Sequence, residues 1–527
     1  MHRSLLALLP AALAALLYLP TLRFAFVWDD WAFVPALTSL DARSVLTSAN
    51  GIHWLPVWDL TFLLDARLSG PGPAGFHATN VVLFVLAVLL VARLYRELLA
   101  AAPEARIAAQ AGPLALVCAL VFAVHPLQVE SVAFVASRGC LLALVFALAS
   151  LLAYGRFASS GGWGSYAASL VFTAAALTSK QSAVTLPLLL LVVHLYFRRD
   201  AGLWRAALRV APHAALGLAA TAIHVSVARS ASFVAPIGSP LEFAARAPHA
   251  LFAAQFYVWK LLWPAKLTIE YDVEGLLRHR AFLAASSIAF VGVFAGLVIE
   301  GWRRRSLGWL CALLYAAALL PVSNLLPTVP MVADRYAQLP LVALVPLVVV
   351  PVLSRLSARV GTVAAALVVV ALTVATVRQV SVWRDDETLT AHTIAVNPKA
   401  TAALGNLGLS LWDRGRSEDA LRVLEQLHEL APTDFRYAYV KGLQAERQGN
   451  LDQAARWLEE AVRGQGEPMY VAHMKLGDVY LRRGRRDDAR RAYERALELS
   501  ARFPVAGPHR YAIQRQLAVL GRSRGSP

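Results

Sequence analysis

The stretch Phe24-Ala25-Phe26-Val27-Trp28-Asp29-Asp30-Trp31 follows the first apolar run of the chain, Leu5 to Leu22. It sets two adjacent carboxylates among aromatic side chains at the predicted edge of a membrane, where an ionisable group costs free energy. We therefore interpret Asp29 and Asp30 as the centre of the protein's chemistry. The alternative is that both are solvated loop residues beside the end of a helix.

The composition of the chain indicates a membrane protein with more than one domain. Of 527 residues, 58% are hydrophobic and 16% are charged, and the mean hydropathy is +0.54. This is too apolar for a soluble globule and too long for a single domain. The net charge of +16 comes from Lys and Arg in short loops between apolar runs and in the C-terminal region. We interpret them as topology determinants and a basic soluble surface, and expect no nucleic-acid partner.

Eleven apolar segments predict a polytopic bundle of membrane helices. Most reach the ~20 residues that a helix needs to cross ~30 Å of hydrocarbon. The segments are 5–22, 77–99, 112–128, 139–155, 164–179, 182–197, 206–228, 281–301, 307–326, 338–354 and 361–378. A further helix-like run, 248–263, would reverse the charge bias of the later loops if it crossed. We predict a re-entrant or interfacial helix there.

The loop charges predict the orientation of the bundle. If the N-terminus is inside, every cytoplasmic connection carries Arg, from Arg93 in the first to Arg359 in the last, as the positive-inside rule requires. No small-x-small cleavage site follows the first run, so we interpret that run as an uncleaved anchor. Asp29, Asp30 and the whole C-terminal region are then extracytoplasmic.

After Arg378 the chain becomes polar and repeats itself. Gly408, Gly442 and Gly477 recur at offsets of 34 and 35 residues. This is the spacing of tetratricopeptide repeats, in which small residues let paired helices approach and the stacked helices form a groove for an extended peptide or a partner protein. The predicted division is a membrane domain over 1–380, a linker over 381–400, about three repeats over 401–503 and a tail over 504–527.

Ionisable side chains gather in the loops predicted to lie outside. They are His53 in the first loop, His77 at the start of the second span, Glu130 and Arg138 after the third, Lys180 after the fifth, Lys260 in the long loop and Arg335 between two late spans. Each alone is explained as a snorkelling or capping residue. Together, carboxylates, cations and aromatics at a membrane surface suit a lipid-borne phosphate substrate, with a carboxylate as general base and Arg and Lys for the phosphate.

Six ordered motifs carry a resemblance to a known family. They are Val27 to Asp30, Gly75 to Asn80, Phe122 to Gly139, Ser179 to Pro187, Leu262 to Tyr271, and Ser323 to Pro340. In this order, with the repeats behind them, the chain resembles the transmembrane-and-TPR-containing O-mannosyltransferases and their bacterial relatives. These belong to the GT-C class of polyprenyl-phosphate-sugar-dependent glycosyltransferases. Gln181 departs from the family, in which an acidic residue is common, and eukaryotic members usually have more repeats.

The resemblance implies an all-α GT-C fold in which Asp29 or Asp30 deprotonates an acceptor hydroxyl and the sugar, a hexose such as mannose, is transferred with inversion. It implies Arg138, Lys180, Arg335 and Lys260 as the cations for the donor phosphate, with Glu130 orienting one of them. The sequence leaves open which aspartate is the base. A divalent metal is compatible with this chemistry, but no ligand set requires one.

The resemblance also implies partners and a location. The donor is a polyprenyl-phosphate sugar, the acceptor is protein Ser or Thr, and the repeats recruit a protein partner. The location is a bacterial inner membrane, with the N-terminus in the cytoplasm and the repeats outside. Two alternatives stay open: transfer to a lipid or polysaccharide of the cell envelope, and a non-catalytic membrane adaptor that works through its repeats.

Overall fold

A computed structural model describes residues 6–38, 43, 45, 54–230, 240–325, 331–466, 468–500 and 507–522. Apart from one isolated bridge between Asp434 and Gln465, the regular elements in these ranges are all helices, which confirms the predicted all-α class. The chain divides into two compact units. The first comprises Met1–Asp30 and Leu37–Arg384, and the second comprises Trp31–Ala36 and Asp385–Pro527.

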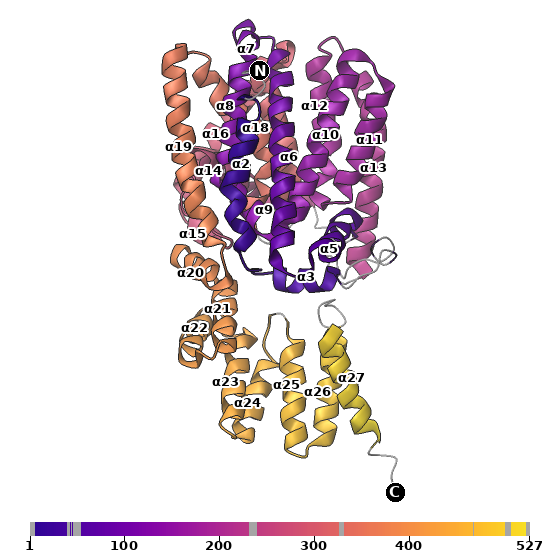
Figure 1. Ribbon diagram of the computed structural model, residues 1–527, viewed down its shortest axis with the longest axis vertical. Coiled ribbons are helices and arrows are strands. Elements are labelled where there is room, and N and C mark those ends of the chain that lie inside the picture. The colour runs from indigo at the N-terminus through magenta and orange to yellow at the C-terminus, as the bar shows by residue number, and fades with distance from the viewer. Residues whose placement is uncertain are drawn as a thin grey trace. The chain divides into compact units, whose positions relative to one another are not determined.

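The first unit is a bundle whose long helices run side by side (Figure 1). Its α-helices are α2 Leu9–Tyr18, α5 Pro56–Ser69, α6 Pro73–Ala100, α7 Ala105–Ala109, α8 Ala111–Val124, α9 Val129–Ala133, α10 Arg138–Ser160, α11 Trp163–Leu177, α12 Leu186–Phe197, α13 Leu203–Ser230, α14 Pro240–Leu262, α15 Val273–Leu277, α16 Arg280–Arg304, α17 Leu307–Leu319, α18 Gln338–Leu353 and α19 Ala358–Val382. Helix α3, Asp30–Thr38, crosses the boundary between the units. Short 3-10 turns connect several of them: η1 Leu19–Arg23, η2 Pro126–Gln128, η3 Val135–Ser137, η4 Gln181–Thr185, η5 Leu320–Val322 and η6 Asp334–Tyr336.

Each of the eleven predicted segments overlaps an apolar helix, so the chain is a membrane protein. Five helices are long and apolar enough to cross a bilayer, and a pair bent by 53°, Ala111–Val124 with Pro126–Ala133, makes up to six. The remaining segments are shorter apolar helices of 10–17 residues. Helix α14, which contains most of the run 248–263, is not among the candidate spans.

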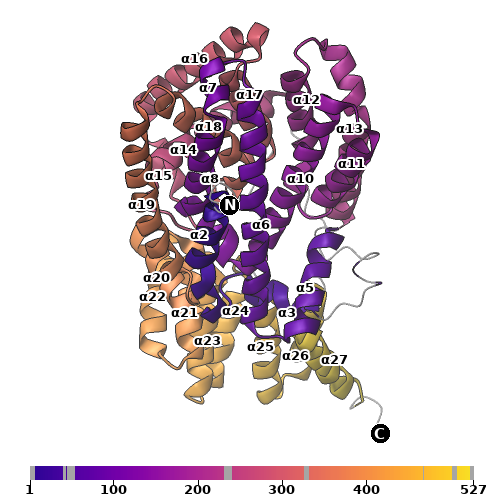
Figure 2. The same cartoon turned by 45° about the horizontal axis from the view of Figure 1, so that its top comes forward.

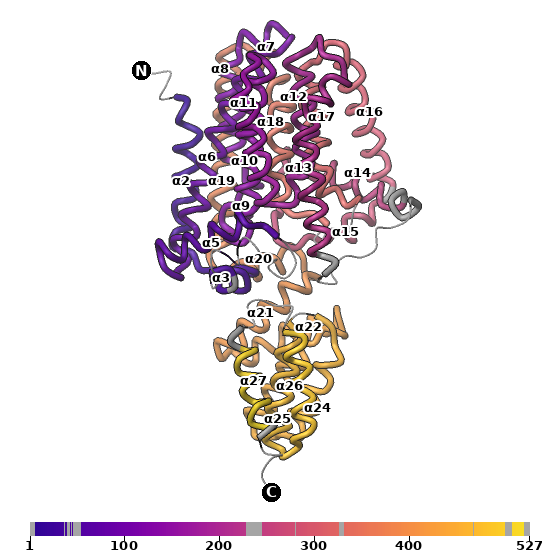
Figure 3. Tube along the Cα trace, turned by 90° about the vertical axis from the view of Figure 1, so that its right-hand side faces the viewer, coloured from indigo at the N-terminus to yellow at the C-terminus, as the bar shows by residue number. Residues whose placement is uncertain are grey.

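Burial separates the centre of the bundle from its margin. In the most apolar part of α10, 83% of the residues are buried. In the most apolar part of α16, none of the residues is buried. Figure 3 shows α16 at the edge of the bundle. Helix α10 therefore provides the central wall on which polar residues can be held, and α16 offers an apolar face to lipid.

The second unit consists of helix pairs that follow one another in chain order (Figure 2). Its helices are α20 Asp386–Val396, α21 Thr401–Asp413, α22 Ser417–Leu430, α23 Phe435–Arg447, α24 Leu451–Ala461, α25 Tyr470–Arg482, α26 Arg486–Ser500 and α27 Gly507–Arg522. A Cβ atom on Gly442 would lie 2.7 Å from Leu458, and one on Gly477 would lie 2.7 Å from Tyr493. The recurring small residues are thus needed where paired helices touch.

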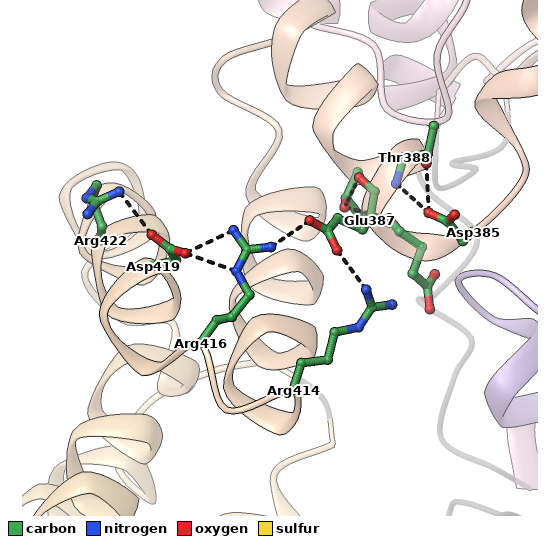
Figure 4. A network of polar contacts seen from close by, with 9 residues as sticks. Asp385, Glu387, Thr388, Arg414, Arg416, Asp419 and Arg422 are labelled. Atoms are coloured by element: carbon green, nitrogen blue, oxygen red, sulfur yellow. Dashed lines mark hydrogen bonds and ion pairs between the residues drawn. The ribbon is translucent and has the colours of Figure 1, made fainter.

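Helix α20 extends the repeats at their N-terminal end. Glu387 on α20 accepts hydrogen bonds from Arg414 at 2.7 Å and Arg416 at 2.8 Å, and Arg416 is also bonded to Asp419 (Figure 4). These side chains are a third to a half exposed, and water weakens the attraction between exposed charges. Each ion pair therefore contributes less than about 1 kcal/mol to the stability of the folded protein. The range 381–400, which the sequence leaves as a linker, contains this helix.

Candidate functional site

Asp29, in the loop between η1 and α3, and Asp30, the first residue of α3, have different surroundings. Asp30 is fully buried, and its carboxylate accepts hydrogen bonds from the backbone N–H groups of Val27 at 3.1 Å and Ala136 at 2.6 Å. Asp29 is exposed. Trp28, just before it, has a left-handed φ of 53°, which costs a non-glycine residue about 1 kcal/mol or more. One carboxylate is therefore fixed in the protein wall and the other is accessible.

The two carboxyl groups also differ electrostatically. Burial raises the pKa of Asp30 to about 8, although its backbone hydrogen bonds oppose the shift. Asp29 is exposed as a residue, but its carboxyl group loses part of its hydration, which raises its pKa, while the nearby charge of Arg335 lowers it. Arg335 therefore favours the ionised form of Asp29, the form that accepts a proton.

Arg335 is held by Glu130. Pro126 ends α8 because it lacks an N–H group and disfavours helix at the residue before it, and the bent chain buries Glu130 in α9. The carboxylate of Glu130 accepts a hydrogen bond from the backbone N–H of Arg335 at 3.0 Å and forms an ion pair with its guanidinium. A buried carboxylate thus orients the cation that acts on Asp29.

Arg335 also lines a largely apolar pocket in the membrane bundle. The apolar wall is made by α10, η4, α12, α17, η5 and α18: Ala143, Leu144, Ala147, Ala183, Leu186, Ala318, Val322, Leu339 and Pro340. Tyr336, Gln338, Ser182 and Cys140 complete the lining. A guanidinium in a pocket of small aliphatic side chains suits an anionic group joined to a hydrocarbon chain.

A second polar network includes the neighbour of Arg335, Asp334. This carboxyl group is buried and accepts a hydrogen bond from the hydroxyl of Tyr271 at 2.7 Å. Burial, and next the charge of Glu130, raise the pKa of Asp334 to about 8. Lys260 is also buried, donates to the carbonyl of Ala265 at 2.7 Å and lies 5.0 Å from the ring centroid of Tyr271. The ammonium of Lys260 therefore already has partners within the protein.

Arg138 is fully buried at the start of α10 and joins three helices. Its guanidinium forms an ion pair with Asp65 at 2.6 Å, and it donates to the side-chain oxygen of Asn80 at 2.8 Å and to the carbonyl of Phe76 at 2.9 Å. It also lies 4.3 Å from the ring centroid of Phe62. With its charge neutralised and its donors engaged, Arg138 is better suited to holding α5 and α6 against α10 than to binding a phosphate.

Asp65 is a residue that the sequence did not single out. It lies in α5, within a stretch interpreted from sequence as the first extracytoplasmic loop. The sequence does offer one indication of its role. Asp65 lies in a 14-residue stretch with several apolar side chains, and a carboxylate buried among such side chains needs a cationic partner. Its partner Arg138 stands 73 positions away, so no local pattern could identify the pair.

The remaining predicted residues lie in different surroundings. Lys180 is half-buried before η4, next to Gly139, and within the described ranges its ammonium has no hydrogen-bond or ion-pair partner. His77 is buried edge-on to the ring of Phe24. His53 lies outside the described residues. The part of the chain that the structure describes contains no group of three His, Cys, Asp or Glu that could hold a metal ion.

The chain is an all-helical membrane protein with tetratricopeptide repeats, since 406–468 and 470–502 match the family models described as tetratricopeptide repeat. It is 33% identical over 193 residues to a Drosophila melanogaster protein named protein O-mannosyl-transferase Tmtc1, over 34% of this chain and 21% of the relative. It is 32% identical over 176 residues to human protein O-mannosyl-transferase TMTC1, over 29% of this chain and 19% of the relative. The chain spans about a fifth of the length of these curated relatives. The predicted resemblance is confirmed.

Proposed function

We propose that the chain is a GT-C-like membrane glycosyltransferase that moves a sugar, such as mannose, from a polyprenyl phosphate to a Ser or Thr hydroxyl of a protein. The observation that carries the proposal is that an exposed carboxylate, Asp29, interacts electrostatically with Arg335, which lines an apolar pocket. The names of the relatives, protein O-mannosyl-transferases, support the reaction class and a protein acceptor.

In the proposed reaction Asp29 is the general base. Its carboxylate takes the proton of the acceptor hydroxyl while that oxygen attacks the anomeric carbon of the donor sugar. The bond from the anomeric carbon to the phosphate oxygen breaks on the opposite side, its electron pair leaves with the polyprenyl phosphate, and the configuration inverts. Asp30, bound by two backbone N–H groups, is a positioning residue that holds the loop.

The donor phosphate is proposed to bind at Arg335, with the start of its isoprenoid chain against the apolar side chains that line the pocket. Glu130 neutralises part of the charge of Arg335, so a second cation is needed to balance the phosphate. Lys180 is the candidate, because it lies two residues before Ser182 of the pocket lining and its ammonium has no partner among the described residues. Arg138 and Lys260, whose charges have protein partners, are proposed to support the walls of the site.

The site and the repeats are proposed to be extracytoplasmic in a bacterial inner membrane, with the N-terminus inside. The Arg residues of the loops between the apolar helices support this orientation. The repeats would then be on the side where a protein acceptor is modified, and are proposed to recruit it.

The test uses membranes that contain native protein, Asp29→Asn or Asp30→Asn at equal abundance. Radiolabelled polyprenyl-phosphate mannose is added, and label is followed into the protein, lipid and polysaccharide fractions. We expect label in the protein fraction with native protein and about 10²-fold to 10⁴-fold less with Asp29→Asn. Label that enters only lipid or polysaccharide would reassign the acceptor. Equal incorporation by native protein and Asp29→Asn across a panel of sugar donors would refute the proposed base.

A further inference from the structure

The corner between α16 and α17 holds a cation between two indole rings. The guanidinium of Arg305, the residue after the end of α16, lies 4.5 Å from the ring centroid of Trp302 and 4.9 Å from that of Trp309. The two indoles meet edge to face, with their centroids 6.1 Å apart. A Cβ atom on Gly301 would overlap Ser306 and Trp309, so this glycine lets the start of α17 approach the end of α16 closely. The packing of two helices therefore fixes the position of the cation.

The backbone of Arg305 has a conformation that usually belongs to glycine. Arg305 ends α16 with a left-handed φ of 51°. Glycine adopts this conformation without strain at the C-terminal end of a helix, whereas it costs free energy for a residue with a Cβ atom. The turn alone thus favours glycine at this position, and the presence of arginine is better explained by what its side chain does.

The charge of Arg305 has no counter-ion in the described part of the chain. Only 9% of the residue is exposed, yet its guanidinium forms no ion pair or hydrogen bond within the described ranges, and its Nη1 atom is buried without a partner. Glu104 lies at the same corner and accepts a hydrogen bond from the backbone N–H of Leu307 at 3.2 Å. Burial nevertheless lowers the pKa of Arg305, and no carboxylate, including Glu104 and Glu300, counteracts this effect. Because a buried charge without a counter-ion is costly, the site favours an anion from outside the chain.

The surroundings of the corner indicate that this anion belongs to a lipid. Helix α16 lies at the edge of the bundle, and none of the residues in its most apolar part is buried (Figure 3). Ile299, three residues before Trp302, is 75% exposed, and Trp302 is 46% exposed. Exposed tryptophans are typical of the boundary between the hydrocarbon and the headgroups of a bilayer. An acyl chain along α16 therefore brings a headgroup to the level of Arg305.

We propose that Arg305 binds the phosphate of an anionic phospholipid whose acyl chains lie against α16. A planar guanidinium can donate to two phosphate oxygens at once, and contact with Trp302 and Trp309 fixes its plane. Arg303 and Arg304, both exposed, add the positive charge that favours an anionic headgroup over a zwitterionic one. Sugar transfer is not needed for this binding, so the two proposals can fail separately.

The test measures the Tm of the purified full chain in a nonionic detergent during titration with dioleoyl phosphatidylglycerol or with the zwitterionic dioleoyl phosphatidylcholine. We expect phosphatidylglycerol to raise Tm by about 2 °C or more, and phosphatidylcholine to raise it much less. Arg305→Gln should need at least about tenfold more phosphatidylglycerol to reach half of the rise. The matched control is Arg304→Gln, which removes an exposed cation from the neighbouring position and should respond as native protein does.

A second variant, Arg305→Gly, separates loss of binding from misfolding. It removes the unpaired charge and supplies the residue that the left-handed backbone favours, so its Tm without added lipid should lie within about 2 °C of that of native protein. The rise with phosphatidylglycerol should nevertheless be lost.

Four results would overturn the proposal. They are no rise of native Tm with phosphatidylglycerol, equal responses of native protein to the two lipids, equal losses of response in Arg305→Gln and Arg304→Gln, and a full response of Arg305→Gly. Glycerol 3-phosphate, which has the phosphate without acyl chains, should leave Tm unchanged at the same concentrations. A rise equal to that with phosphatidylglycerol would show that the ligand is a soluble anion and not a lipid.

Discussion

The carboxylate of Asp30 accepts a hydrogen bond from the backbone N–H of Ala136 at 2.6 Å, across 106 positions of the sequence. This bond ties the loop that carries Asp29 to the turn before α10. Because Asp30 is buried and bonded while Asp29 is exposed, substitutions at these two neighbours should have different consequences.

Asp30→Ala should lower the thermal stability of the protein, whereas Asp29→Ala should not. The first substitution leaves the N–H groups of Val27 and Ala136, the first buried and the second partly buried, without their acceptor. The loss of each hydrogen bond should lower the free energy of unfolding by at most about 1–3 kcal/mol. The measurement is the Tm of each purified variant in the same detergent. Equal Tm values for Asp30→Ala and native protein would contradict the positioning role of Asp30.

The effect of Asp30→Asn on stability should depend on pH. Burial raises the folded pKa of Asp30 to about 8, far above the ~3.9 of an unfolded Asp, so the folded state binds its proton more tightly. Its contribution to stability is therefore present below about pH 4 and is lost as the pH rises through about 8. Since Asn cannot ionise, Tm of the variant should rise relative to native protein between these pH values. A constant difference would contradict the raised pKa.

The pH dependence of transfer should report Asp29. Loss of hydration raises the pKa of Asp29 and Arg335 lowers it, so the acid limb of kcat/KM should lie above the pH expected for an ordinary aspartate. Arg335→Gln removes the lowering effect and should move that limb to higher pH, in addition to weakening donor binding. Initial rates over a pH series test this. An acid limb at the same pH in both proteins would mean that Arg335 does not act on the base.

Lys180→Gln should raise KM for the lipid donor about tenfold without changing Tm. The ammonium has no partner among the described residues, so its loss leaves no buried group unpaired, and one charge-assisted contact to phosphate is worth about 1.4 kcal/mol or more. The control is Arg156→Gln, an exposed cation on α10. An unchanged KM for Lys180→Gln would remove this residue from the donor site.

Asp65→Asn should destabilise the bundle by about 3–5 kcal/mol, because it leaves the buried charge of Arg138 without its counter-ion. Glu97→Gln breaks the ion pair with Arg93, whose side chain is 53% exposed, and should cost less than about 1 kcal/mol. Thermal unfolding of the two variants in parallel makes the comparison. If both variants lose the same small amount of stability, Asp65 and Arg138 are not the buried link between α5 and α10.

Much of the architecture follows from sequence because its causes are local. Apolar segments near 20 residues and Gly recurring at 34 and 35 residues are visible in any window of the chain, and each predicted segment overlaps an apolar helix. The candidate site was harder to predict. As a cation beside a predicted outer loop, Arg138 is expected to bind phosphate, but its partners Asp65, Phe76 and Asn80 come from two other helices.

By itself the sequence determined that this is a membrane bundle followed by helical repeats, since hydrophobicity and repeat period act over short stretches of chain. Only the tertiary structure decided which charged side chains are neutralised and which remain accessible. Folding brings together segments that are distant in the sequence. It buries Asp30, pairs Arg335 with Glu130 across 205 positions and leaves Asp29 exposed. The reason is that hydration and charge pairing depend on the distances between groups in space, and the separation of residues along the chain does not specify these distances.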